Sequence, residues 1–131
     1  MMDDDCSTGN PRPHKRLVVW QVSVDLVVHV HETTRRFPAA ERFGLVAQMN
    51  RAALSIPSNI AEGAARRSRK EYLLFLYVAR ASASELDTQL EIALRLNYLS
   101  TKDYEGLQVE LDRVAKMLNA LIRALSRSSS E

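Results

Sequence analysis

The clearest pattern of hydrophobic and polar positions lies in the C-terminal third of the chain. Apolar residues recur there at alternating steps of three and four, at Tyr104, Leu107, Leu111, Val114, Leu118, Leu121 and Leu125. This spacing places all of these side chains on one face of an α-helix. Ser100 precedes the segment and Asp103 follows three residues later, a capping pattern typical of a helix N-terminus. We therefore predict one amphipathic helix from about residue 101 to residue 126.

A long helix is also predicted just before it, from Ser68 to about Leu96. Ser68 with Glu71 forms a capping box ahead of the apolar run, and Asn97 can adopt the left-handed conformation that ends helices. The apolar residues point in more than one direction: one row is Tyr72, Phe75, Ala79, Ser82 and Leu86, and another is Leu73, Leu76, Ala83, Leu90 and Leu94. A helix that is apolar on several faces must be buried on several faces. In a chain this short the extra surface favours a contact between subunits, so the pattern predicts a homo-oligomer.

The first half of the chain contains two further helical segments. Over residues 17–32 the alternation of valines resembles a strand, but the length of the run and its lack of Gly or Pro favour a helix. Phe37 and Pro38 end this helix, because the residue before a proline is disfavoured in the α conformation, and Pro38 can open the next one. The second segment, about residues 39–66, has apolar residues at helical steps and contains Pro57, which removes one backbone donor. We expect this proline to kink the helix.

Four helices joined by short connections predict an all-α, antiparallel up-and-down four-helix bundle over residues 15–126, with its second helix kinked at Pro57. Residues 1–14 and 127–131 lack an apolar period and are predicted to be disordered tails. The composition agrees with one globular domain, since the 131 residues are 46% hydrophobic and 26% charged. Gly and Pro are scarce, at four each, which favours long helices over turns.

The chain carries no sign of secretion or membrane insertion. No apolar run approaches the roughly 18 residues of a membrane span, and Asp3, Asp4 and Asp5 stand where a signal peptide would be basic. Cys6 is the only cysteine and cannot form an internal disulfide. We therefore expect a cytoplasmic protein that does not associate with a membrane.

Charge is unevenly distributed, although the net charge is only +2. Residues 35–70 hold eight Arg or Lys against two Glu, a local charge of +6, whereas residues 71–105 hold three basic against six acidic residues, a local charge of −3. The candidate nucleic-acid-binding residues are Arg51, Arg66, Arg67, Arg69 and Lys70. Such cations bind phosphates, and no aromatic residue is interleaved with the cluster, which indicates contacts to the nucleic-acid backbone. The alternative is a solvated corner that only keeps the protein soluble.

A second group of polar residues surrounds Pro57 and recurs in the third helix. Its members are Ser58, Asn59, Glu62, Glu85 and Gln89. Pro57 leaves one backbone carbonyl without its helical partner, and nearby polar side chains can satisfy such groups or reach another helix. We interpret the group as a structural polar network. The alternative is a ligand or catalytic site in which Glu62 and Glu85 act as carboxylates.

Most catalytic and metal-binding patterns are missing from the sequence. A di-iron bundle uses Glu-x-x-His pairs, but Pro11, Leu26 and Val28 stand three residues before the three histidines. A single cysteine in a tail makes zinc a poor fit, and the four glycines are isolated, so there is no phosphate-binding glycine loop. A Ser-His-acid arrangement stays open, because such triads are recognised by geometry. We predict a non-enzymatic protein without cofactor, metal or small-molecule substrate.

Residues 55–63 read SIPSNIAEG and resemble the signature of a bacterial four-helix-bundle family, the S23-like proteins encoded in intervening sequences of 23S ribosomal RNA genes. Further segments similar to that family are Val19–Gln21, Glu41–Leu45, Arg67–Leu76, and Ser84, Glu85 and Leu86 with Gln89. The resemblance covers about residues 17–125. It implies an up-and-down bundle assembled as a ring-like pentamer, in a family without an established biochemical activity. A related group of basic pentameric bundles binds RNA and assists reverse transcriptases, which makes RNA an expected partner by analogy alone.

Together these observations predict a non-enzymatic homo-oligomer, pentameric by the resemblance, that acts as an adaptor for RNA or a nucleoprotein through its basic cluster. The alternative is a purely structural protein–protein interaction scaffold that binds no nucleic acid.

Overall fold

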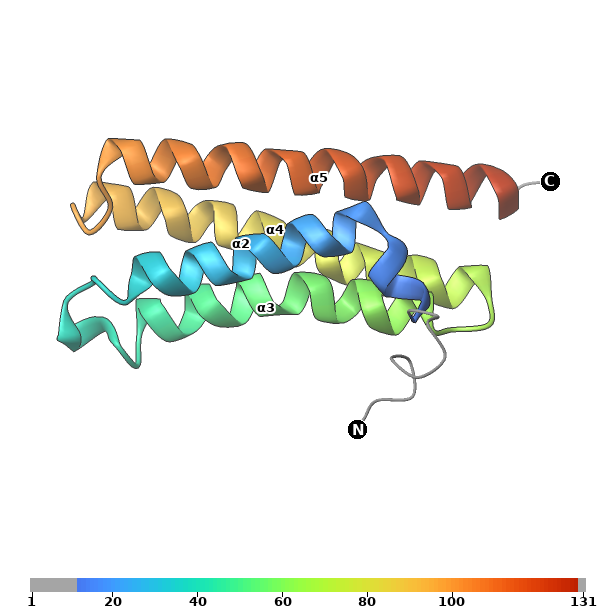
Figure 1. Ribbon diagram of the computed structural model, residues 1–131, viewed down its shortest axis with the longest axis horizontal. Helices are drawn as coiled ribbons and strands as arrows, with labels where there is room; N and C mark the ends of the chain where they lie inside the picture. Colours follow the sequence, from blue (N-terminus) through green and yellow to red (C-terminus); the bar gives the residue numbers. More distant parts are fainter. Residues whose placement is uncertain (1–11, 130–131) are drawn as a thin grey trace.

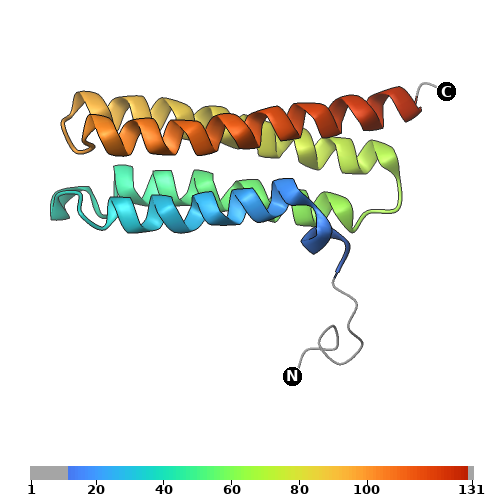
Figure 2. The same ribbon diagram turned by 45° about the horizontal axis from the view of Figure 1, so that its top comes forward.

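The computed structural model describes residues 12–129, and over these residues it contains helices and no strands (Figure 1). The elements are η1 (Pro13–Arg16), α2 (Val18–Thr34), η2 (Ala39–Glu41), α3 (Leu45–Ala64), α4 (Arg69–Arg95) and α5 (Thr101–Ser129), where η denotes a short 3-10 helix. Helix α2 contacts α3 and α5, and α4 contacts the same two helices. Figure 2 shows the α2–α3 pair lying against the α4–α5 pair, with successive helices antiparallel. The predicted all-α four-helix bundle is confirmed.

The core lies between the four helices along their length. Its fully buried large side chains include Leu26, Met49, Ile56, Ile60, Leu76, Leu86, Leu90 and Leu118. Burying one such side chain stabilises the fold by about 1.5–3 kcal/mol. The periodic row of α5 supplies buried Leu107, Leu111, Val114 and Leu118, as its steps of three and four predict.

The predicted capping residues set the boundaries of α4 and α5. Ser68 Oγ accepts a hydrogen bond from the backbone N–H of Glu71, and Ser100 Oγ accepts one from Asp103, each at 3.0 Å. Asn97 has a φ of 63°, the left-handed conformation that follows the end of a helix. All three predictions are confirmed.

The valine-rich segment folds as helix α2, as predicted. Its inward face is the row Val19, Ser23, Leu26, Val30 and Thr34, all buried. After the helix, Phe37 is buried and its ring centroid lies 5.4 Å from that of Tyr98. Tyr98 Oη also donates a hydrogen bond to Glu41 Oε2 at 2.8 Å. These contacts fasten the α2–α3 connection to the α4–α5 connection at one end of the bundle.

Helix α3 begins later than the sequence predicts. Residues 39–41 form η2, and Gly44 has φ −107° and ψ −109°, which is not a helical conformation, so the α-helix starts only at Leu45. The helix continues through Pro57 to Ala64, which shows that the proline does not break it. The kink at Pro57 stays a prediction.

The ends of the bundle also differ from the predicted tails. η1 overlaps the predicted N-terminal tail, and the ring of His14 lies 5.0 Å from that of Trp20, which packs this turn against α2. Helix α5 continues to Ser129, because no Gly or Pro follows Leu125 to stop it, so residues 127–129 are helical. Residues 1–11, including Cys6, and residues 130–131 lie outside the described part of the chain. None of the helices within residues 12–129 is both long and apolar enough to cross a membrane.

Candidate nucleic-acid interface

The connection between α3 and α4 presents the basic cluster at one end of the bundle (Figure 1). α3 ends at Ala64 and the cap at Ser68 starts α4, so the chain reverses within a few residues. We call the cluster the basic corner; its members are Arg66, Arg67, Arg69 and Lys70, and all four side chains are exposed. The geometry therefore brings together four of the five predicted nucleic-acid-binding residues.

Arg66 is already engaged by its own chain. Its Nη2 lies 3.6 Å from Glu62 Oε2, and its guanidinium carbon lies 4.8 Å above the ring of Phe75. A cation paired with a carboxylate and stacked on an aromatic ring loses part of its attraction for an external phosphate. Arg66 therefore helps to hold the basic corner in place more than it adds positive charge available to a phosphate.

The other three cations of the basic corner are not neutralised by carboxylates. Among residues 12–129, none of Arg67, Arg69 and Lys70 takes part in an ion pair. Their charges also lie close to the N-terminal end of α4, where positive charge is unfavourable to the helix dipole. Three exposed cations at one corner are thus available to an anionic partner.

η1 adds positive charge at the same end of the bundle. It contacts both α2 and α3 and lies near the α3–α4 connection (Figure 1). Its Lys15 and Arg16 are exposed. The sequence analysis did not include them in the candidate site, because only the packing of η1 on α3 brings them to this end.

Arg51 is separated from the basic corner. It lies on α3, thirteen residues before Ala64, which corresponds to about 20 Å along the helix. The side chain is exposed and donates a hydrogen bond from Nη2 to Gln48 Oε1 at 2.6 Å. Any contact of Arg51 with nucleic acid would therefore be a second contact and not part of the corner.

The polar motif of α3 contacts α4 through a serine pair. Ser55 Oγ lies 2.7 Å from Ser82 Oγ. Asn59 Nδ2 donates to the backbone oxygen of Ser55 at 2.8 Å and to Ser55 Oγ at 3.0 Å. Asn59 was predicted to belong to a polar network. Ser55 and Ser82 were not, although both lie in segments that the sequence analysis named.

The remaining predicted network residues lie elsewhere. Gln89 Nε2 donates to Glu85 Oε2 at 3.3 Å on α4, while Glu62 pairs with Arg66 and Ser58 is exposed. Gln89 is only 8% exposed, and its Oε1 is buried without a hydrogen-bond partner among the described residues. The structure therefore does not bring the five predicted residues into one network within a single chain.

The two carboxylates of the enzyme hypothesis are far apart. Because Gly63 lies against Tyr72 on the antiparallel α4, Glu62 lies near the level of Tyr72. Glu85 is thirteen residues further along α4, or about 20 Å away along the helix. Glu62 and Glu85 thus do not form a paired carboxylate site. Within residues 12–129 there is also no group of three or more His, Cys, Asp or Glu that could hold a metal ion.

Gly63, within the SIPSNIAEG segment, permits a close approach of α3 and α4 beside the basic corner. A Cβ atom built at this position would lie 2.9 Å from Tyr72 Cδ1, 3.0 Å from Phe75 Cβ and 3.1 Å from the backbone oxygen of Tyr72. The shortest of these contacts is one that real Cβ atoms essentially never make, and the contact with the backbone oxygen is tighter than nine in ten real Cβ contacts. The glycine therefore sets the separation of the helices that the corner connects.

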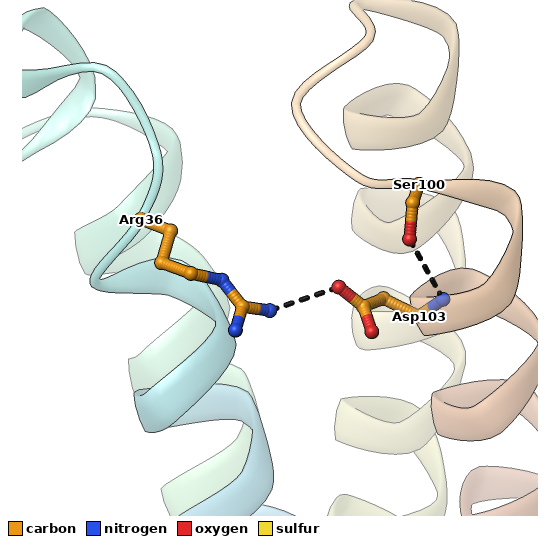
Figure 3. A network of polar contacts seen from close by, with 3 residues as sticks. All are labelled: Arg36, Ser100 and Asp103. Atoms are coloured by element: carbon orange, nitrogen blue, oxygen red, sulfur yellow. Dashed lines mark hydrogen bonds and ion pairs between the residues drawn. The ribbon is translucent and has the colours of Figure 1, made fainter.

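Polar contacts also join α2, and the connection that follows it, to α5. At the end opposite the basic corner, Arg36 Nη2 lies 2.8 Å from Asp103 Oδ2, and the same aspartate donates its backbone N–H to Ser100 (Figure 3). About two helical turns further along α5, His29 Nδ1 lies 2.6 Å from Glu110 Oε1. The hydrogen bond with Glu110 raises the pKa of His29 above its ordinary value, against a smaller opposing effect of desolvation.

An apolar stripe on α4 is exposed to solvent. Its members are Leu74, Val78, Ala81, Ile92 and Leu96, which share one face of the helix. Leu74 is 56% exposed and Val78 48% exposed. Glu85 lies on the same face between Ala81 and Ile92 and accepts a hydrogen bond from Gln89 Nε2. We call this surface the α4 stripe; it differs from the two rows that the sequence analysis named, whose side chains are buried or half-buried within the single chain.

Comparison with known proteins identifies a matching family and a solved structure with a similar fold. A sequence model of the family described as "23S rRNA-intervening sequence protein" matches residues 15–120. A crystal structure from Bacteroides thetaiotaomicron, described as a protein with unknown function from the S23 ribosomal protein family, is similar with a TM-score of 0.76 and 25% sequence identity. The similarity covers 81% of this chain and 96% of that one. No curated protein is a significant match to the chain.

Proposed function

The chain belongs to the family of 23S rRNA-intervening sequence proteins, and on that premise we propose that it is a non-enzymatic cytoplasmic adaptor that binds RNA or a nucleoprotein. The observation that carries the proposal is the basic corner, in which Arg67, Arg69 and Lys70 are exposed and free of ion pairs within residues 12–129. Phosphate contacts of this kind supply most of the sequence-independent affinity of nucleic-acid-binding proteins.

Self-assembly is the second part of the proposal. The α4 stripe leaves large apolar side chains in water, and such surfaces are typical of contacts between chains. A ring of copies, pentameric as the resemblance implies, would repeat the basic corner and increase its affinity for a long nucleic acid. A light-scattering mass equal to one chain at micromolar concentration would refute the oligomer.

Binding of a labelled structured RNA across a salt series tests the nucleic-acid part. The structure selects the double variant Arg67→Glu with Arg69→Glu, because Arg66 is engaged by Glu62 and Phe75. If two phosphate contacts are lost, the slope of log affinity against log salt should become shallower by about 1.4–1.8.

The matched control is Arg113→Glu with Lys116→Glu, two exposed cations on α5 away from the corner. It changes the net charge by the same amount and should leave most of the binding intact. If both double variants lose affinity equally, the effect comes from net charge and the corner is not the site. If the unaltered protein does not bind RNA at low salt, the scaffold alternative replaces the proposal. In that alternative the α4 stripe or another surface binds protein alone.

A further inference from the structure

The turn between η2 and α3 exposes an aromatic ring at the end of the bundle opposite the basic corner (Figure 1). Phe43 is 88% exposed, the highest value among the exposed large hydrophobic residues of the described chain. The guanidinium carbon of Arg42 lies 5.8 Å from the centroid of its ring. An apolar ring in water is thus presented together with a cation.

The neighbours of Phe43 hold this turn in place. Glu41 Oε2 accepts the hydrogen bond from Tyr98 Oη at 2.8 Å, and Glu41 Oε1 accepts a longer one from the backbone N–H of Leu45 at 3.4 Å. Glu41 and Leu45 flank the turn on both sides. The ring is therefore presented on an anchored segment, so binding a ligand costs less conformational entropy of the turn.

A basic groove lies beside the turn. It has a volume of about 340 Å³ and is lined by Arg35 and Arg42 together with the apolar Phe37 and Val46. Within residues 12–129, neither Arg35 nor Arg42 forms an ion pair, whereas the adjacent Arg36 is neutralised by Asp103 (Figure 3). The groove therefore keeps a positive charge next to an exposed ring.

We propose that this surface, formed by Phe43, Arg42 and Arg35, binds a single-stranded segment of nucleic acid, with one base stacked on Phe43 and the neighbouring phosphates held by the two arginines. Cations alternating with exposed aromatic rings are typical of single-strand binding, because every base has a face that can stack. A contact between copies is less favoured here, since one ring buries at most about 250 Å², whereas a stable interface buries about 800 Å² per partner. The α4 stripe is the larger apolar surface.

This inference rests on the proposed nucleic-acid function and adds a second, chemically different contact. α3 separates the two ends of the bundle by about 30 Å along its twenty residues. Arg51 lies between them on the same helix and is exposed. The basic corner contacts backbone alone, whereas the Phe43 surface selects unpaired bases, so variants at the two ends give different results.

The test uses a labelled RNA strand of about 16 nucleotides, the upper end of common single-strand site sizes, and an abasic strand of equal length. Phe43→Leu keeps the apolar bulk and removes the aromatic face; it should weaken binding to the base-containing strand about fivefold or more and leave the abasic strand unchanged. Phe43→Tyr keeps the ring and should retain binding. Arg42→Gln should weaken binding to both strands.

Other outcomes overturn this proposal or separate it from the proposal for the basic corner. Equal loss on both strands, or no loss on either, shows that Phe43 does not stack on a base. A changed light-scattering mass for Phe43→Leu shows that the ring is buried between copies. If Phe43→Leu discriminates between the strands while Arg67→Glu with Arg69→Glu has no effect, the basic corner is refuted and the Phe43 surface stands. If the unaltered protein binds neither strand, the Phe43 proposal fails, and the basic corner is then judged by the structured-RNA measurement alone.

Discussion

Replacing Gly63 with alanine tests the close contact between α3 and α4 next to the basic corner. A Cβ atom at this position meets Phe75 Cβ at 3.0 Å and the backbone oxygen of Tyr72 at 3.1 Å. Neither atom can move away by a side-chain rotation, so α3 and α4 must separate. Overpacking of this kind costs about 1–3 kcal/mol. In an unobstructed helix the same substitution stabilises the protein by about 0.5–1 kcal/mol, so the expected net loss is up to about 2.5 kcal/mol.

Gly106 provides the matched control, because it also lies inside a helix but a Cβ built there meets no atom within 4 Å other than those of its chain neighbours and of the nearby backbone of its own helix. We expect Gly106→Ala to stabilise the protein by about 0.5–1 kcal/mol. Urea unfolding of both variants at one protein concentration measures the difference, provided that the slope of the transition is unchanged. If Gly63→Ala raises the midpoint as Gly106→Ala does, the helices are not in close contact at Gly63 and the explanation of the motif is wrong.

Three further predictions concern α2, α4 and their contacts. The pKa of His29 is raised by Glu110, so the pair stabilises the fold fully below the ordinary His pKa of about 6.5, and this contribution disappears as the pH rises through the higher folded value. Glu110→Gln should therefore lower the free energy of unfolding more at about pH 5 than at about pH 8. Because the pair is exposed, the difference should be less than about 1 kcal/mol. An equal loss at the two pH values would contradict a stabilising His29–Glu110 pair. Ser68→Ala removes the hydrogen bond that caps α4 and should lower the free energy of unfolding by about 1 kcal/mol, whereas an unchanged urea midpoint means that the cap does not contribute. Val78→Asp places a charge in the α4 stripe and should lower the light-scattering mass while the helical circular dichroism is kept; an unchanged mass excludes this stripe as the contact between copies.

Candidate site residues were harder to predict than helices. Sequence reasoning identified the basic corner, because four of its residues are neighbours in the chain and no distant contact is needed to assemble them. It did not identify the internal engagement of Arg66, since Phe75 joins it only when α4 folds back on α3. It also paired Glu62 with Glu85, whereas the antiparallel register places Ser55 beside Ser82.

What the sequence by itself determined is local: the four helices, the caps at Ser68 and Ser100, and the left-handed residue Asn97. These features depend on hydrogen bonds and apolar spacing within three or four residues, so they can be recognised without the fold. Tertiary structure alone decided which side chains meet across helices, where η1 lies and how Phe43 is exposed. Such contacts depend on the rotation and register of whole helices, which are set by the packing of many core side chains together.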